Sequence, residues 1–399
     1  RVLRIFGLHG NSVLALMVSG GIAGGCAVPG VMAARTLRDP KERLATILVT
    51  PLMNCGAKLP VYAMLIAAFF VGRQAGMMFL LTLISWGVAL IAARIIRSTV
   101  LRGEHTPFVM ELPPYRLPTC KGLLIHTWER SWQYIKKAGT VILGISILLW
   151  AMMSFPGLPE EKVRGFEDQR TEVTKIFLAG PGAEVLTDKE ALTLFARYYA
   201  SFKKDGQRAE TGPSPEFSAL AQAVSALNHE KSPDELSAKY KEAAQAWIDR
   251  ADRLTAIDGA EASTALRYSI GGRLGVALEI ITRPLGFDWR TNIALVGGFA
   301  AKEVVVATMG TAYSLSEVNP DSSEPLSEKL AREPGWTPLT AFTLILFVMI
   351  YAPCFVTVVV IIRETNWKWG LFAMAYTTTA AYVICLAVAL TGRALGLGV

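Results

Sequence analysis

Three cysteines occur where apolar segments are interrupted by glycine or proline, and their chemistry suits a metal ion. Cys26 lies in GGIAGGCAVPG, Cys55 in PLMNCGAKLP and Cys354 in IYAPCFVTVV. Thiolate is a soft ligand that favours Fe(II), Zn(II) and related metals over Mg²⁺ or Ca²⁺. The sequence therefore predicts a site for a borderline divalent metal at these interruptions. The competing interpretation is that each thiol is a small packing residue.

Other ligand types stand beside or opposite these cysteines. Met53 and Asn54 directly precede Cys55, and the carboxylate of Glu303 stands inside another apolar run. Thiolate, thioether, amide oxygen and carboxylate together suit Fe(II), but they do not separate it from Mn(II), Co(II) or Zn(II). Cys120 and Cys385 are expected to be structural. The predicted metal-site residues are Cys55, Cys354, Cys26, Glu303, Met53 and Asn54.

Two lysines lie at the same interruptions. Lys302 precedes Glu303 in the apolar run, and Lys58 separates two uncharged stretches. An ionisable group at membrane depth costs at least about 2.5–3.5 kcal/mol and is by default a functional hypothesis. We expect Lys58 and Lys302 to act in gating or in setting the charge of the site. The alternatives are that Lys302 and Glu303 simply neutralise neighbouring charges, or that Lys302 pairs elsewhere.

The composition places these residues in membrane helices. The 399-residue chain is 52% hydrophobic and only 18% charged, whereas a soluble protein carries about a quarter charged residues. A helix needs about 20 apolar residues to span a bilayer. The long uncharged runs are 11–34, 77–93, 138–156, 337–362 and 369–392. They lack the two-residue alternation of an outer-membrane barrel, so a multi-pass helical membrane protein is expected.

The distribution of charge sets the expected topology. Basic residues gather after residue 34 and again between residues 94 and 137, and such loops are normally cytoplasmic. The lipid bilayer therefore accounts for the basic excess, and no nucleic-acid partner is expected. Residues 157–268 are instead charged and net acidic. A capping box, Ser232 to Glu235, opens a predicted helix in this soluble insert.

The two halves of the chain repeat the same interruptions. GGIAGGCAVPGVMA (20–33) aligns with GGFAAKEVVVATMG (297–310), and PLMNCGAKLP (51–60) aligns with IYAPCFVTVV (350–359). Paired interrupted segments point to a transporter binding site, because irregular backbone at membrane depth is tolerated where it lines a cavity or is buried in protein.

The predicted fold is an all-α, polytopic transmembrane helical bundle with two repeated modules containing broken helices, plus a small helical soluble insert. Residues 1–98 form the first repeat and its following helix, and 99–137 a cytoplasmic proline-rich and interfacial amphipathic segment. Residues 138–156 form a connecting transmembrane helix, 157–268 the insert, expected to be periplasmic, and 269–399 the second repeat with the C-terminal helices.

Several motifs resemble a known family. GCAVPGVMAARTL, PLMNCGAKLPVYA, LRGEHTPFVMELPPYRLP, GGFAAKEVVVATMGTAY and YAPCFVTVVVIIRE occur in that order between residue 20 and about residue 364. They resemble the membrane half of FeoB, the ferrous iron transport protein B of bacteria and archaea. The two repeats are similar to the Gate modules of that family, which also resemble parts of nucleoside transporters.

The resemblance implies Fe(II) transport across the bacterial inner membrane, with the metal passing between helix breaks lined by cysteine. It implies that Cys55 and Cys354 are iron-path residues and that the segment around Cys26 belongs to the same path. It also implies a small FeoA-type cytoplasmic partner and allows a homo-oligomer.

The family carries an N-terminal GTPase region, which is expected to gate this permease portion. The chain contains no GxxxxGK[ST] phosphate loop, so no GTP site and no enzymatic activity are expected of it. It starts at RVLRIFG without an initiator Met, and we expect a piece of a longer protein.

Three other functions remain open from the sequence. A Gate-type carrier of a small organic solute such as a nucleoside would need several converging polar side chains. A membrane-embedded enzyme is opposed by the lack of HExxH and GxSxG motifs in the chain. A receptor or scaffold would act through the insert, and deletion of 157–268 would then abolish its function.

Overall fold

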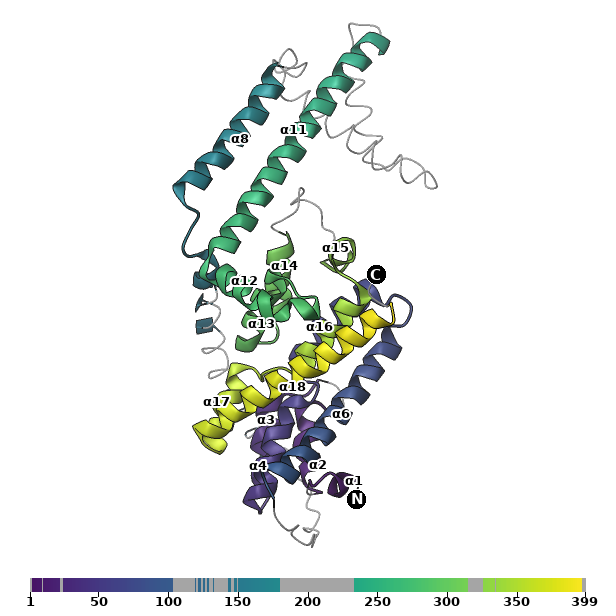
Figure 1. Ribbon diagram of the computed structural model, residues 1–399, viewed down its shortest axis with the longest axis vertical. Coiled ribbons are helices and arrows are strands. Elements are labelled where there is room, and N and C mark those ends of the chain that lie inside the picture. The colour runs from purple at the N-terminus through teal and green to yellow at the C-terminus, as the bar shows by residue number, and fades with distance from the viewer. Residues whose placement is uncertain are drawn as a thin grey trace. The chain divides into compact units, whose positions relative to one another are not determined.

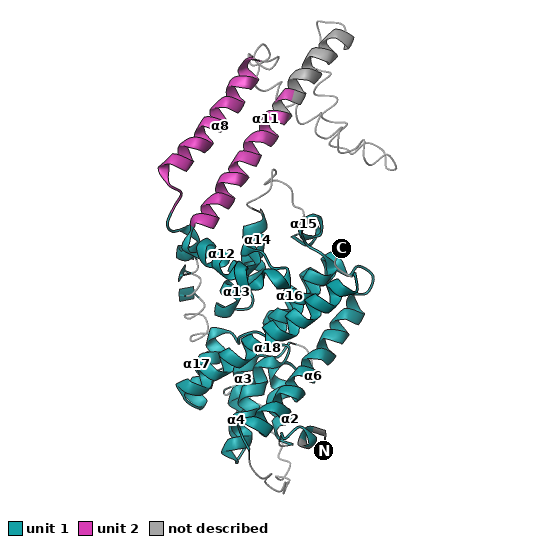
Figure 2. Cartoon of the chain, in the orientation of Figure 1, with its two compact units in different colours: residues 1–156, 269–313, 324–399 teal, residues 157–268, 314–323 magenta. Residues whose placement is uncertain are grey.

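The computed structural model describes residues 2–8, 10–21, 24–102, 150–179, 233–314, 326–333 and 335–396, together with isolated positions between 119 and 148. Their contacts divide the chain into two compact units, shown in Figure 2. Unit 1 comprises Arg1–Pro156, Ser269–Tyr313 and Glu324–Val399, and unit 2 comprises Gly157–Tyr268 and Ser314–Ser323.

The first repeat of unit 1 is a series of short helices followed by one long helix (Figure 1). The helix α4 is well specified, because Pro40 occupies its first turn and the Asp39 side chain accepts a hydrogen bond from Lys41 N at 2.9 Å. The α-helices are α1 (Val2–Ile5), α2 (Ser12–Leu16), α3 (Ala27–Ala33), α4 (Pro40–Val49), α5 (Leu59–Phe69) and α6 (Gln74–Thr99). Shorter turns are a π-helix η1 (Met17–Gly21) and the 3-10 helices η2 (Ala34–Thr36), η3 (Thr50–Leu52) and η4 (Gly56–Lys58).

The second repeat has the same character. Side chains cap four of its helices. Ser269 accepts from Gly272 N and Asp288 from Thr291 N. Thr337 accepts from Thr340 N and Asn366 from Trp369 N. The helices are α12 (Ile270–Thr282), the 3-10 helix η5 (Arg283–Leu285), α13 (Trp289–Ala300), α14 (Val304–Ser314), α15 (Leu326–Arg332), α16 (Pro338–Ile350), α17 (Phe355–Glu364) and α18 (Trp367–Ala394).

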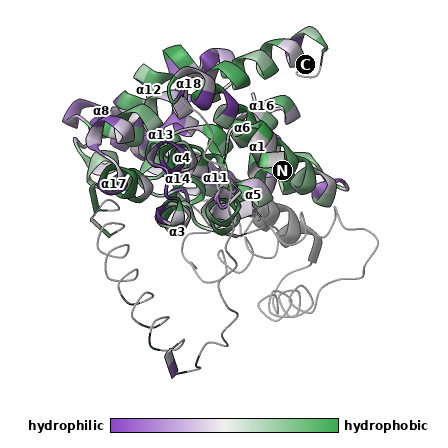
Figure 3. Ribbon diagram, turned by 90° about the horizontal axis from the view of Figure 1, so that it is seen from below, coloured by the Kyte–Doolittle hydropathy of each residue, from purple (hydrophilic) through white to green (hydrophobic). Residues whose placement is uncertain are grey.

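Unit 1 is built from apolar helices of membrane-spanning length. Three described segments are long and apolar enough to cross a bilayer: Gln74–Thr99, Pro338–Glu364 and Trp367–Ala394. Large apolar side chains on α6 and α18, such as Phe79 and Val383, are exposed, as expected of a surface that faces lipid. Figure 3 shows the predominance of hydrophobic residues along these helices. The expectation of an all-α membrane bundle is confirmed.

Among the described residues, four non-helical stretches that interrupt the apolar segments are considered together, and we call them the four breaks. Each lies between two helices and has non-helical backbone: residues 24–26, 53–55, 301–303 and 351–354. The first two breaks contact each other, because Gly56 N donates to Gly25 O at 2.8 Å in an isolated parallel bridge. Gly20 permits this approach, since its φ is +137° and an added Cβ would lie 1.9 Å from Asn54 O.

The helix α16 forms the centre of the core. All its residues from Thr343 to Ile350 are buried, and it packs against α5 of the first repeat and α18 of the second. Burial of a predominantly apolar stretch of helix on every side is typical of the core of a membrane bundle. The helix therefore fixes the position of the fourth break against the second.

Two helices of unit 1 differ from the sequence expectation. In unit 1, α12 carries three glycines near its start, which weaken the helical pattern. Gly275 nevertheless serves packing, because a Cβ there would lie 2.6 Å from Trp289 O of α13. The helix α6 also extends beyond the uncharged run to Thr99, since Arg97 in its last turn is compatible with a helix C-terminus.

Unit 2 contains a pair of helices, α8 (Glu160–Ala179) and α11 (Pro233–Tyr268). Arg170 joins them by donating to Asp258 Oδ1 at 2.6 Å and to Glu261. The hydrogen bonds from Arg170 to Asp258 and then to Glu261 raise the pKa of Arg170. The helix that the capping box at Ser232 predicts is α11, which continues to Tyr268. Most of the segment 99–137, with Cys120, and much of the first half of 138–156 lie outside the described residues.

Candidate functional site

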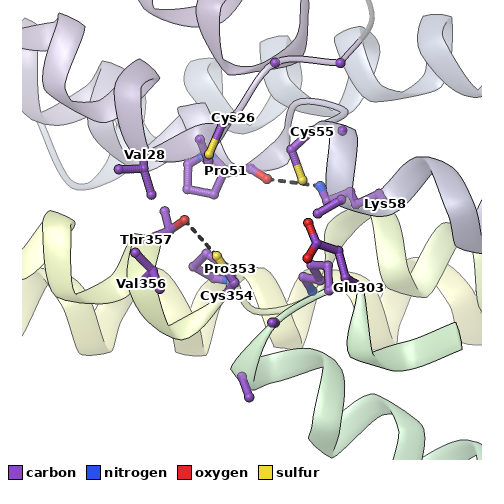
Figure 4. A pocket seen from close by; sticks show the side chains of 18 of the residues that line it. Cys26, Val28, Pro51, Cys55, Lys58, Glu303, Pro353, Cys354, Val356 and Thr357 are labelled. Atoms are coloured by element: carbon purple, nitrogen blue, oxygen red, sulfur yellow. Dashed lines mark hydrogen bonds between the residues drawn. The ribbon is translucent and has the colours of Figure 1, made fainter. Parts of the chain in front are cut away.

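A cavity of about 280 Å³ in unit 1 is lined by residues from all four breaks. We call it the cysteine cavity. Figure 4 shows Cys26 and Cys55 of the first repeat on one side and Cys354 and Glu303 of the second repeat on the facing side. The lining residues whose side chains can do chemistry are Cys26, Cys55, Lys58, Lys302, Glu303, Tyr351, Cys354 and Thr357.

The three cysteines occupy equivalent positions in the chain trace. Each has extended backbone directly before a helix: Cys26 before α3, Cys55 before η4 and α5, and Cys354 before α17. All three are partly exposed, whereas Cys385 is buried in α18. Helix N-termini favour negatively charged groups, and thiolates are metal ligands. The breaks therefore place three sulfur atoms where an anionic ligand is favoured.

Cys354 has a polar neighbour that the sequence argument missed. Its Sγ lies 3.1 Å from the hydroxyl Oγ1 of Thr357, which is buried and lines the same cavity. The two residues are separated by one helical turn at the start of α17. A Cys-x-x-Thr spacing at a predicted helix start could have identified this pair.

Glu303 is the acidic residue of the third break. It lies between α13 and α14 and is exposed to the cysteine cavity. Figure 4 shows its carboxylate directed into the cavity, on the side of Lys58. A carboxylate and three thiols from different segments thus face one space, although they are distant in sequence.

The two predicted lysines are both buried at the cavity, but they have different surroundings. Lys58 Nζ donates to three backbone carbonyls, Pro51 O, Met53 O and Met349 O. Lys302 Nζ lies 3.0 Å from the centre of the Tyr351 ring, and among the described residues it has no hydrogen-bond acceptor. Lys58 is therefore held by hydrogen bonds, and Lys302 by contact with an aromatic face.

Met53 and Asn54 do not line the cavity. Their exposed fractions are 1% and 7%, and Asn54 Oδ1 accepts a hydrogen bond from Tyr62 Oη at 3.3 Å. Asn54 Nδ2 lies 3.5 Å from Leu81 O. Both residues belong to the core behind the second break, so their predicted role as ligands would need the break to rearrange.

The potential ligands are not gathered at one point. Within the part of the chain that the structure describes, no group of three or more His, Cys, Asp or Glu side chains lies close enough to hold a metal ion. The cavity is an open space with ligands on its walls. Such an arrangement suits passage of an ion better than permanent retention.

An ionic cluster joins the far ends of two helices that begin at the cavity. Arg35 Nε donates to both carboxylate oxygens of Glu364 at 2.9 Å, and Arg43 Nη2 donates to Glu364 Oε2 at 2.8 Å. The hydrogen bond from Arg35 to Glu364, and then the carboxylate charge, raises the pKa of Arg35. Arg35 follows α3, and Glu364 ends α17.

Comparison with known proteins decides the family. A family model described as Gate, nucleoside recognition, matches residues 1–69 and 135–368. A second, described as the C terminus of ferrous iron transport protein B, matches residues 78–130. The chain belongs to the FeoB family. The resemblance identified from the sequence motifs is thereby confirmed.

Curated FeoB relatives match almost the whole chain. A Helicobacter pylori Fe(2+) transporter FeoB is 31% identical over 387 residues, which cover 96% of this chain and 49% of that protein. A Porphyromonas gingivalis protein named as a fusion of Fe(2+) transport protein A and Fe(2+) transporter FeoB is 30% identical, over 96% of this chain and 38% of that protein. An Fe(2+) transporter FeoB from Methanocaldococcus jannaschii is 27% identical, over 99% of this chain and 43% of that protein.

The chain spans less than half the length of each of these relatives. No solved structure matches it. The family assignment therefore rests on sequence, and the arrangement of the FeoB-type breaks around the cysteine cavity comes from the structure described here.

Proposed function

We propose that this chain is the permease portion of a ferrous iron transporter, and that Fe(II) passes through the cysteine cavity. The observation that carries the proposal is that one cavity is lined by all four breaks and by Cys26, Cys55, Cys354 and Glu303. The names of the FeoB relatives support Fe(II) as the cargo. Thiolate and carboxylate ligands suit this borderline divalent ion.

In the proposed path, the ion exchanges ligands as it moves between the repeats. Cys26 and Cys55 belong to the first repeat, and Glu303 and Cys354 to the second. Conduction needs sites that bind the ion weakly enough to release it. Ligands dispersed over the cavity wall would bind Fe(II) in this way. Met53 and Asn54 would join as ligands when the second break moves. Lys58 and Lys302 would limit the net charge of the loaded cavity.

The remaining features of the proposal follow the family. The chain would lie in the bacterial inner membrane as a multi-pass protein and act as a permease without enzymatic activity of its own, while a GTPase region gates it. The relative named as a transport protein A fusion supports a FeoA-type partner. A homo-oligomer is compatible with this assembly.

A carrier of nucleosides is the weaker reading, although the Gate family model is described by nucleoside recognition. Lys58 and Tyr351 of the cavity wall already donate to backbone carbonyls. The polar groups left to orient an organic solute are few, chiefly Lys302, Glu303 and Thr357. Excess nucleoside is therefore expected not to compete with Fe(II) uptake.

The test is anaerobic Fe(II) accumulation in cells that carry the whole transporter as their iron-uptake route. A variant combining Cys55→Ser with Cys354→Ser should lower uptake to the background of cells without the transporter. Cys385→Ser is the matched control, because Cys385 is buried away from the cavity, and it should keep uptake. Unchanged uptake by the double variant would refute the proposed path.

A further inference from the structure

Lys58 has the most complete hydrogen bonding of the charged groups at the cysteine cavity. Its exposed fraction is 2%, and Nζ donates to Pro51 O at 3.2 Å, Met53 O at 3.0 Å and Met349 O at 2.7 Å. An ammonium group has three N–H donors, whereas a neutral amine has two. Three carbonyl acceptors therefore hold the charged form of Lys58.

These carbonyls belong to helix ends in different repeats. Pro51 lies in η3, which continues α4, and Met53 directly follows η3 in the second break. Met349 lies in the last turn of α16. Carbonyls in the last turn of a helix lack partners within it and carry partial negative charge. We call the oxygens of Pro51, Met53 and Met349 the carbonyl cage.

An oxygen-only cage of this kind has a clear ligand preference. Carbonyl oxygens at the ends of broken membrane helices coordinate ions such as Na⁺ in transporters, and hard cations in general prefer oxygen over sulfur. Without Lys58, the carbonyl cage would thus offer a hard cation a site beside Cys55. Carbonyls left unpaired at membrane depth would each be costly, so the cage needs a positive occupant.

We propose that Lys58 is a specificity-determining residue whose tethered ammonium fills the carbonyl cage and keeps hard cations such as Na⁺ out of it. By bonding both repeats, the same ammonium positions Cys55 relative to the second repeat. The consequence for iron selectivity rests on the proposed function, whereas occupancy of the cage does not.

Lys302 provides the matched comparison. It lines the same cavity, its exposed fraction is 3%, and its Nζ contacts the Tyr351 ring in place of carbonyl oxygens. Lys302→Ala therefore removes a buried positive charge from the same cavity without vacating an oxygen cage. A change in stability or cation response that Lys58→Ala shows and Lys302→Ala does not is therefore due to loss of the ammonium group from the carbonyl cage.

The test is chemical rescue of Lys58→Ala in the purified chain without iron. Propylammonium is the part of the lysine side chain that this substitution deletes. Thermal unfolding is measured in choline chloride, sodium chloride, propylammonium chloride and uncharged 1-propanol. We expect Lys58→Ala to unfold below the wild type, and propylammonium and Na⁺ to raise its midpoint by several degrees relative to choline or propanol. The wild type and Lys302→Ala should show no such difference.

A Lys58→Ala midpoint that is the same in all four media would overturn the proposal. Should this variant not fold, Lys58→Gln keeps two N–H donors on a shorter side chain, and Na⁺ should raise its midpoint as well. An unresponsive Lys58→Gln would then be the overturning result. Because the samples contain no iron, a negative result here is distinct from failure of the proposed iron path.

The selectivity consequence is measured separately by Fe(II) binding. Sodium chloride should weaken Fe(II) binding to Lys58→Ala several-fold relative to choline chloride, because Na⁺ then occupies the carbonyl cage beside Cys55. Wild-type binding should be equal in the two salts. Equal binding by the variant would remove the link between the cage and iron selectivity.

Discussion

Arg35 and Glu364 join the C-terminal ends of α3 and α17, the two helices whose N-terminal ends carry Cys26 and Cys354. The two helices also pack against each other. Because a packed helix pair moves as a unit, the ion pair fixes the spacing of two cavity cysteines from about one helix length away. We therefore expect a change in the ionic cluster to alter the spacing of Cys26 and Cys354.

Glu364→Gln should destabilise this helix pair. The Glu364 side chain is only 5% exposed and is bonded by two arginines, so the neutral variant leaves two cations without a carboxylate. Because charged hydrogen bonds to a partly buried carboxylate are lost, the free energy of unfolding should fall by about 1–2 kcal/mol. This loss is measured as a lower thermal unfolding midpoint. The control is Arg38→Ala, at an exposed position three residues after Arg35, which should leave the midpoint unchanged. Equal behaviour of the two variants would argue against the coupling.

Gly20→Ala should disrupt the contact between the first two breaks. Its Cβ would lie 1.9 Å from Asn54 O at a φ of +137°, and neither strain can relax through a flexible side chain. A loss of about 2–4 kcal/mol is expected, again measured by thermal unfolding.

The matched control for Gly20 is Gly87→Ala in α6, where an added Cβ meets no heavy atom within 4 Å. Helix propensity predicts unchanged stability or a gain of about 0.5–1 kcal/mol. If Gly20→Ala left the unfolding midpoint as unchanged as Gly87→Ala does, the first two breaks could not pack as closely as described.

Lys302→Met should strengthen Fe(II) binding. The substitution removes a positive charge that lines the cavity without leaving a hydrogen-bond acceptor unpaired. Removing one unit of cation repulsion at this depth should increase affinity by about tenfold or more. Lys302→Arg retains the charge and should not share the gain. Weaker binding by Lys302→Met would show that the lysine supports the site.

Fe(II) should protect three cysteines from a small, water-soluble thiol reagent. Cys26, Cys55 and Cys354 are partly exposed and line the cavity, whereas Cys385 is buried. Mass spectrometry of the anaerobically treated chain should find the first three labelled without iron and protected with it. Labelling of the three that is indifferent to Fe(II) would contradict metal binding in the cavity.

The sequence predicted the elements of the site better than its arrangement. Cysteine, proline and glycine at repeated positions were enough to predict the breaks, and the structure places Cys26, Cys55, Cys354, Lys58 and Glu303 around one cavity. This was possible because apolar composition and helix-breaking residues are local signals. The role of these residues in metal binding is still a prediction.

What the sequence could not predict depends on contacts between distant residues. Thr357 is a plain helical residue until its hydroxyl lies beside the Cys354 sulfur, and the three acceptors of Lys58 are backbone atoms, which carry no sequence signal. Met53 looks like a ligand beside Cys55, but the alternation of the extended second break turns it into the core. Met53 is thus close to Cys55 in sequence, but its side chain packs in the core and does not line the cavity.

The most direct measurement is anaerobic Fe(II) titration of the purified chain, followed by thiolate-to-iron charge-transfer absorption. The wild type and Cys385→Ser should develop the absorption band, and the combined Cys26→Ser, Cys55→Ser and Cys354→Ser variant should not. The same band in the triple variant, or no band in the wild type, would contradict iron binding in the cysteine cavity.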